Sequence, residues 1–138
     1  MRFAFRELPD PTGPGARARP IVDVVVEGLE LAPQACLLDS GASAVRMGRH
    51  VADLAGLDLE SAPSTKVAVG GGLVEGRLSE VNLQVNADRE THQWNTSVWF
   101  CDPWRPAFGL LGLTGFFDQF IVTLAAYEEW FELRLLDR

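Results

Sequence analysis

Short runs of apolar and β-branched residues, separated by turn-forming residues, recur along the 138-residue chain. Few segments place apolar residues at the three- to four-residue spacing of a helix. The pattern therefore predicts an all-β protein with one or two short helices. Strands are expected at residues 1–8, 21–31, 34–39, 96–102 and 107–112, with hairpins at 64–86 and 120–136. Glu27-Gly28 is expected to turn the chain within the second of these segments.

Two segments favour helix and one favours loop. Residues 45–57 place apolar side chains on one face of a short helix, with Gly56 suited to its C-terminal cap; these side chains are Val45, Val51, Leu54 and Leu57. The stretch "TGFFDQF" at 114–120 is expected to form a helical turn or two. Residues 9–20 contain four prolines and two glycines, which predicts a loop or mobile arm.

Composition is that of an ordinary globular domain, with 47% hydrophobic and 22% charged residues. The net charge of −7 argues against a nucleic-acid partner, which requires clustered Lys and Arg. No apolar run is long enough for a signal peptide core or a membrane span, so a cytoplasmic protein without a membrane partner is expected.

The cysteines and histidines show no metal-ligand spacing, and no metal or organic cofactor is expected. Cys36 and Cys101 lie in apolar contexts, which favours two buried free thiols over one disulfide. His50 and His92 have no Cys or acid nearby at ligand spacing. Trp104, in "DPWRP", is the best candidate for an exposed aromatic side chain that meets a partner or substrate.

Asp39 stands in an unusual place, between Leu37-Leu38 and the small residues Ser40-Gly41. A carboxylate in an apolar setting is usually paired, protonated or functional. Two carboxyls about 3 Å apart share a proton and can divide the acid and base roles of amide hydrolysis. The alternative is an acid that caps a turn or the following helix. A serine hydrolase is disfavoured, because neither Ser40 nor Ser43 lies in a Gly-x-Ser-x-Gly motif.

Two further motifs follow Asp39. Gly70, Gly71 and Gly72 form the tip of the predicted hairpin at 64–86. A glycine tip can be a flexible flap over a bound chain, a plain exposed turn, or a nest of amides for an anion. The second motif is "FGLLGLTGFFDQF", in which an apolar-apolar-Gly strand (Leu110, Leu111, Gly112) runs into the expected short helix.

In this order and spacing, "LLDSGAS" (37–43), the Gly-rich hairpin (66–78) and "GLLGLTGFFDQFIVTL" (109–124) resemble a retropepsin-like aspartic protease. The similarity is greatest to the single-domain retropepsin-like proteins of bacteria, and it extends from about Arg19 to the C-terminus. It divides the chain into an N-terminal strand and Pro/Gly-rich arm (1–18) and a protease domain (19–138).

The resemblance implies a closed β fold and a symmetric homodimer that cleaves peptides, with one catalytic Asp39 from each subunit. Ser40 would brace the two Asp loops across the dimer axis, supported by Gly41 and Ala42 in the same loop. Leu111 and Gly112 would pack behind that loop. Substrate would be held by the loop edge and the flap, at Ser43, Val69, Gly70, Gly71, Gly72 and Leu73. Apolar pockets are expected from Leu38, Val69, Leu73 and Leu111.

The chain departs from the viral pattern at two places. Leu113 and Thr114 stand where viral enzymes carry Arg and a polar or acidic residue, and Ser43 replaces a common acid. These departures leave two alternatives to the peptidase. One is a non-catalytic dimerisation or peptide-binding module, and the other is a protease half that pairs with a different chain.

Overall fold

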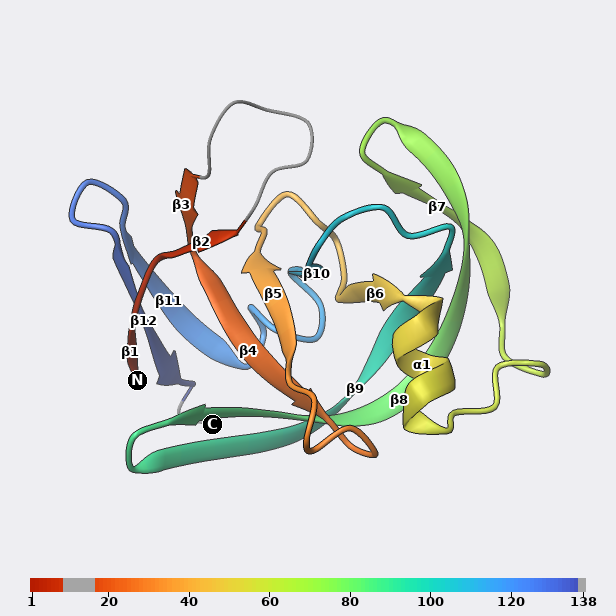
Figure 1. Ribbon diagram of the computed structural model, residues 1–138, viewed down its shortest axis with the longest axis horizontal. Helices are drawn as coiled ribbons and strands as arrows, with labels where there is room; N and C mark the ends of the chain where they lie inside the picture. The colour runs from red at the N-terminus through yellow and green to blue at the C-terminus, as the bar shows by residue number, and fades with distance from the viewer. Residues whose placement is uncertain (9–16, 137–138) are drawn as a thin grey trace.

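The computed structural model describes residues 1–8 and 17–136, and strands dominate these residues (Figure 1). The largest sheet has seven strands in the order β4-β5-β10-β6-β9-β8-β7, with a further pairing of β4 to β8. Its strands are β4 (Ile21–Val26), β5 (Gln34–Leu38), β6 (Arg46–Gly48), β7 (Ser64–Val69), β8 (Gly72–Ala87), β9 (Glu90–Asp102) and β10 (Gly109–Leu111). The all-β prediction is confirmed. The β4–β8 pairing curls the sheet back on itself, which is why one layer of strands can enclose a core.

Two smaller sheets contain the remaining strands, and the first of them joins the two ends of the chain. In the first, β1 (Arg2–Ala4) and β11 (Phe120–Ala125) flank β12 (Trp130–Leu135), which confirms the closing hairpin. In the second, β2 (Arg6–Leu8) pairs with β3 (Arg17–Arg19). The expectation of a loop through residue 20 was therefore wrong for 17–19, where the ladder with β2 outweighs the neighbouring prolines. Residues 9–16 lie outside the described part of the chain.

The core fills the space between the curled sheet and the C-terminal strands. Phe100, Phe116, Phe120 and Phe131 are fully buried in it. Trp94 packs edge-on against Phe120, and its indole Nε1 donates a 2.7 Å hydrogen bond to the Gly115 carbonyl. These aromatic contacts hold the segment that follows β10 against β9.

A single helix, α1 (Arg49–Ala55), is present in the described residues. Gly56 ends it in the left-handed conformation with φ of 78°, as the sequence predicts. The predicted apolar face was wrong in two members. Val45 precedes β6 and is buried there, and Leu54 is 68% exposed on the solvent side. The helix buries Val51, as predicted, together with Ala52.

The second predicted helix does not form. Residues 113–119 make consecutive turns, in which the Gly115 amide donates to Asp118 Oδ2 at 3.1 Å and the Gln119 amide to the Phe116 carbonyl at 2.9 Å. Gly115 has φ of 99°, a conformation that interrupts a right-handed helix. The β9 strand begins at Glu90, earlier than the expected residue 96, because its polar first residues still pair with β8 across the hairpin.

Both cysteines are buried and free, as the sequence favours. Burial raises the pKa of Cys36 to about 12 and that of Cys101 to about 11, so both thiols are held in the neutral form. Neither is therefore placed to act as a nucleophile. In residues 1–8 and 17–136, no helix is long and apolar enough to span a membrane.

Candidate active site

Asp39 is delivered by a strand whose neighbour comes from a distant part of the sequence. β5 ends at Leu38, and it runs parallel to β10 with Leu37 opposite Leu110 and Leu38 opposite Leu111. The Asp39 amide continues this ladder by donating to the Leu111 carbonyl at 3.0 Å. The two motifs that stood out in the sequence are therefore joined directly through their backbones.

The turn after β5 fixes the Asp39 carboxyl group. Its Oδ1 accepts a 2.9 Å hydrogen bond from the Gly41 amide, and its carbonyl accepts one of 3.1 Å from the Ala42 amide. Within the described residues, Oδ2 has no hydrogen-bond partner and no bond joins Asp39 to a second carboxyl. The half-buried side chain therefore presents one free oxygen from a fixed position.

Gly112 lies against the other side of this turn. A Cβ at Gly112 would lie 2.3 Å from the Ala44 carbonyl oxygen and 2.7 Å from that of Ala42. The next amides, those of Leu113 and Thr114, donate to the Ala42 and Ser43 carbonyls at 2.9 Å each. This lattice of backbone hydrogen bonds puts Leu111 and Gly112 behind the Asp39 turn, and only glycine permits so close an approach.

The hairpin of β7 and β8 forms as the sequence predicts. Val69 pairs with Gly72, so Gly70 and Gly71 alone make the turn, with φ of 58° and 83°. No other atom lies within 4 Å of a Cβ built at Gly70 or Gly71, so the tip is open. Leu73, just after it, is 71% exposed.

The sequence did not single out Arg46, which connects this hairpin to the Asp39 turn. Its Nη2 donates to Ser43 Oγ at 3.1 Å, and its Nη1 donates to the Ala68 carbonyl of β7. In the sheet order, β9 and β8 separate β6 from β7. Three flat strand spacings would put about 14 Å between β6 and β7. The contact therefore requires the sheet to curve, so that β7 returns over the face that carries Arg46.

One face of strands β5, β10, β6 and β9 carries a row of half-buried side chains that lie opposite one another on neighbouring strands. Leu37 lies opposite Leu110, Leu110 opposite Arg46, and Arg46 opposite Trp99. Register partners point to the same side of a sheet, so these four residues form a row, here called the Arg46 row.

The expectation that Leu38 and Leu111 line apolar pockets was wrong. Leu38 is 7% exposed and Leu111 is fully buried, because both point into the core on the opposite face from the Arg46 row. Leu37 and Leu110 are the half-buried leucines of these two strands. Adjacent leucines in β5 and β10 gave the sequence no means of telling the two faces apart.

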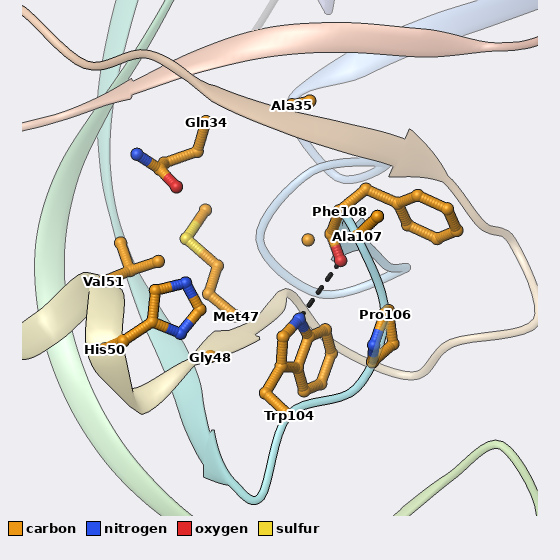
Figure 2. A pocket seen from close by; sticks show the side chains of 11 residues that line it. Gln34, Ala35, Met47, Gly48, His50, Val51, Trp104, Pro106, Ala107 and Phe108 are labelled. Atoms are coloured by element: carbon orange, nitrogen blue, oxygen red, sulfur yellow. Dashed lines mark hydrogen bonds between the residues drawn. The ribbon is translucent and has the colours of Figure 1, made fainter. Parts of the chain in front are cut away.

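A separate hollow lies at the opposite end of β5 from Asp39 (Figure 2). Its wall includes Gln34, Met47, His50 and Trp104, and no residue of the Asp39 turn contributes to it. Trp104 is half-buried there, and its Nε1 donates to the Phe108 carbonyl at 3.2 Å. This hollow is therefore distinct from the Asp39 site, and the contact of Trp104 with a partner stays a prediction. No cluster of three or more metal-ligating side chains occurs in the described ranges.

The chain was compared with protein families, curated proteins and solved structures. No protein-family model matches the chain, and no curated protein matches its sequence. Among solved structures, a retropepsin-like aspartic protease from Rickettsia conorii matches with a TM-score of 0.51 at 17% identity, covering 82% of this chain and 87% of that chain. The chain therefore has the retropepsin-like fold, which confirms the expectation from the three sequence motifs.

Two further structures match with lower scores. The EIAV protease, complexed with the inhibitor HBY-793, has a TM-score of 0.44 at 19% identity and covers 68% of this chain and 81% of that one. The retroviral protease-like domain of Ddi1 from Leishmania major has a TM-score of 0.43 at 20% identity, covering 69% and 72%.

Proposed function

We propose that this chain, with its retropepsin-like fold, is an aspartic endopeptidase that works as a homodimer with one Asp39 from each subunit. The observation that carries the proposal is the Asp39 turn. One carboxylate oxygen is fixed by the Gly41 amide, the backbone is held by Leu111, and the other oxygen is left free. The Gly41 contact is one that any turn-capping acid makes, and Asp58 makes it with the Glu60 amide. The proposal therefore depends on the place of the Asp39 turn, whose backbone is held by Leu111 of β10 in a retropepsin-like fold.

Hydrolysis of a peptide bond would follow from two such Asp39 carboxyl groups in contact. At about 3 Å they cannot both ionise, so they share one proton. The ionised carboxylate takes a proton from a water held between them, and the water oxygen attacks the peptide carbonyl carbon. The protonated carboxyl donates its proton to the carbonyl oxygen. Collapse of the tetrahedral intermediate breaks the C–N bond. The departing amine takes the proton from the first carboxyl, and one hydroxyl of the intermediate gives its proton to the second carboxylate, which restores the pair with one shared proton.

The second Asp39 is assigned to a second copy of the chain because the sequence holds one Asp-Ser-Gly motif. Ser40 is exposed at the turn, where it could meet its counterpart across a two-fold axis. Leu113, hydrogen-bonded to the same turn through its amide, is 51% exposed. Within the described residues, β11 is an edge strand of its sheet. These features supply apolar area and unpaired backbone for a partner subunit.

Substrate is proposed to bind as an extended strand between the Asp39 turn and the β7–β8 hairpin. The hairpin would act as a flap, with Val69, Gly70, Gly71, Gly72 and Leu73 closing over the chain. Gly41 would offer its carbonyl and Ser43 its polar atoms to the substrate backbone. Leu37 and Leu110 replace Leu38 and Leu111 as the apolar residues beside the bond that is cut.

The test compares how wild type and Asp39→Asn cleave a library of peptides at about pH 4 to 7. The amide variant keeps the side-chain shape but cannot take up or share a proton, so cleavage should fall by about a thousandfold or more. The matched control is Asp53→Asn, the same change at an exposed aspartate of α1, and this variant should cleave like wild type. No cleavage by wild type, or equal cleavage by Asp39→Asn, would contradict the peptidase and favour a peptide-binding module.

A further inference from the structure

Among the described residues, Arg46 contacts both the Asp39 turn and the hairpin through its guanidinium group. We propose that Arg46 makes the site select peptides with an acidic side chain close to the bond that is cut. The inference rests on the proposed function, because it names the substrate class of the same site.

The position of Arg46 sets how far the acidic side chain lies from the cut. β10 separates β6 from β5, and Arg46 lies opposite Leu110, which lies opposite Leu37. Two strand spacings place Arg46 about 10 Å from the strand that delivers Asp39. An extended substrate advances about 3.3 Å per residue, so the acidic side chain belongs within about three residues of the cut.

The surroundings of the guanidinium leave its charge unmatched. Other arginines meet carboxylates, as in Arg6–Asp23 at 2.7 Å and Arg77–Glu75 at 3.0 Å. In the part of the chain that the structure describes, Arg46 forms no such ion pair, and its two hydrogen bonds go to a hydroxyl and a carbonyl. Its Nε is buried with no hydrogen-bond partner.

The buried Nε is out of reach of a substrate, but Nη1 and Nη2 each hold a second N–H that the hydrogen bonds to Ala68 and Ser43 leave unused, and a carboxylate can accept from both. Arginine binds a carboxylate through two parallel N–H groups, which lysine cannot do. Ser43 is exposed beside Arg46, so a substrate side chain can approach the guanidinium from the face that the hairpin covers. The neighbouring Trp99 and Leu110 restrict the route by which water reaches the pair, which strengthens a charged hydrogen bond.

A purely structural role for Arg46 predicts a different result. If the residue only ties the hairpin to the Asp39 turn, its loss should slow cleavage of all peptides alike. An acid-selecting residue instead changes the ratio between acidic and neutral substrates. The ratio for Glu against Gln separates the two roles, because these side chains have nearly the same size.

The test uses pairs of ten-residue peptides with a central apolar pair and a single Glu or Gln one to three residues from the central bond. Wild type should cleave the best Glu peptide with a kcat/KM about tenfold or more above that of its Gln partner. Arg46→Gln should bring this ratio to about one, and Arg46→Lys should leave an intermediate value. The matched control is Arg49→Gln, which removes a positive charge three residues away and should keep the wild-type ratio.

Binding measured on Asp39→Asn separates failure of this inference from failure of the proposed function. Fluorescence anisotropy of the same labelled pairs gives the Glu/Gln affinity ratio with and without Arg46→Gln. Cleavage without a Glu preference overturns the inference and leaves the peptidase standing. A Glu preference in binding that needs Arg46, without cleavage by wild type, supports the inference and overturns the peptidase. No preference in either measurement overturns the inference even if Arg46→Gln fails to fold, because wild type alone shows it.

Discussion

The backbone amide of Asp39 donates a 3.0 Å hydrogen bond to the carbonyl of Leu111. This bond extends the parallel ladder between β5 and β10 into the turn that carries the carboxyl group. The Asp39 side chain is thus oriented by a strand from the last third of the chain. Changes near Leu111 should therefore affect the Asp39 turn before they affect the rest of the fold.

Gly112→Ala should destabilise the protein by about 2 to 3 kcal/mol, because the new methyl group would overlap two backbone carbonyls. Those oxygens, of Ala44 and Ala42, lie 2.3 and 2.7 Å from the Cβ position and belong to the Asp39 turn. Urea denaturation measures the loss. Gly72→Ala is the control, since its Cβ would meet only the Val69 carbonyl at 3.9 Å, and it should change stability by about 0.5 kcal/mol or less. Equal effects of the two substitutions would contradict the close packing at Gly112.

Leu113→Glu should weaken the proposed dimer by about tenfold or more, because it would place a carboxylate in the proposed interface of an acidic protein. Sedimentation velocity over a range of concentrations measures the effect. Leu54→Glu offers a matched control, since Leu54 is also an exposed leucine but lies on α1. A wild type that stays monomeric, or two variants with the same dissociation constant, would argue against this interface.

Acidification should destabilise the fold through His92. The ring stacks on Trp94 and meets Phe120 edge-on, and its Nε2 is buried without a partner. Burial lowers its pKa below the ordinary 6.5. The unfolded chain therefore takes up the proton at higher pH, so the stability that His92 contributes is present above about pH 6.5 and is lost as pH falls.

His92→Phe keeps the ring contacts and removes the titration, so its urea midpoint should fall less than that of wild type between about pH 7.5 and 5.5. His50→Gln, at an exposed position, should leave the wild-type pH dependence in place. A wild-type slope that survives in His92→Phe would show that other groups cause it.

Alkali should destabilise the fold through Cys36. Burial raises the pKa of this thiol from 9.0 to about 12, so the unfolded chain loses the proton first as pH rises. The stability that the buried neutral thiol of Cys36 contributes is fully present below about pH 9 and is lost progressively above that pH. Cys36→Ala should thus lose less stability than wild type between about pH 8.5 and 10.5, in urea denaturation. Rapid modification of Cys36 by a thiol reagent in the folded protein would contradict its burial.

The sequence was sufficient for the motifs that depend on local chemistry. The Asp39 turn, the glycine tip at Gly70 and the Gly56 cap each need a residue type that few positions tolerate, so each was visible in the chain. The order of the three motifs also predicted the retropepsin-like fold. The local features come from residue chemistry, whereas the fold was predicted only through the resemblance that the three motifs carry.

What the sequence could not give depends on which side of a strand a residue faces. Leu37 and Leu38 are equally apolar, and only pairing with β10 shows that Leu38 enters the core. Arg46 was missed because Ala68, its partner in β7, lies 22 residues away in the sequence. The helix expected at 114–120 failed because Gly115 and Asp118 stabilise turns there.

The central claim is that each chain holds half of a catalytic site, and subunit mixing tests it most directly. Wild-type protein is incubated with an equal amount of Asp39→Asn until the subunits exchange, and its peptide cleavage is compared with that of the same amount of wild type alone. A site shared between subunits predicts that activity falls to about half, because half of the wild-type chains then pair with an inactive partner. Activity that is unchanged by the added variant would show that Asp39 works without a second copy, and would contradict the account.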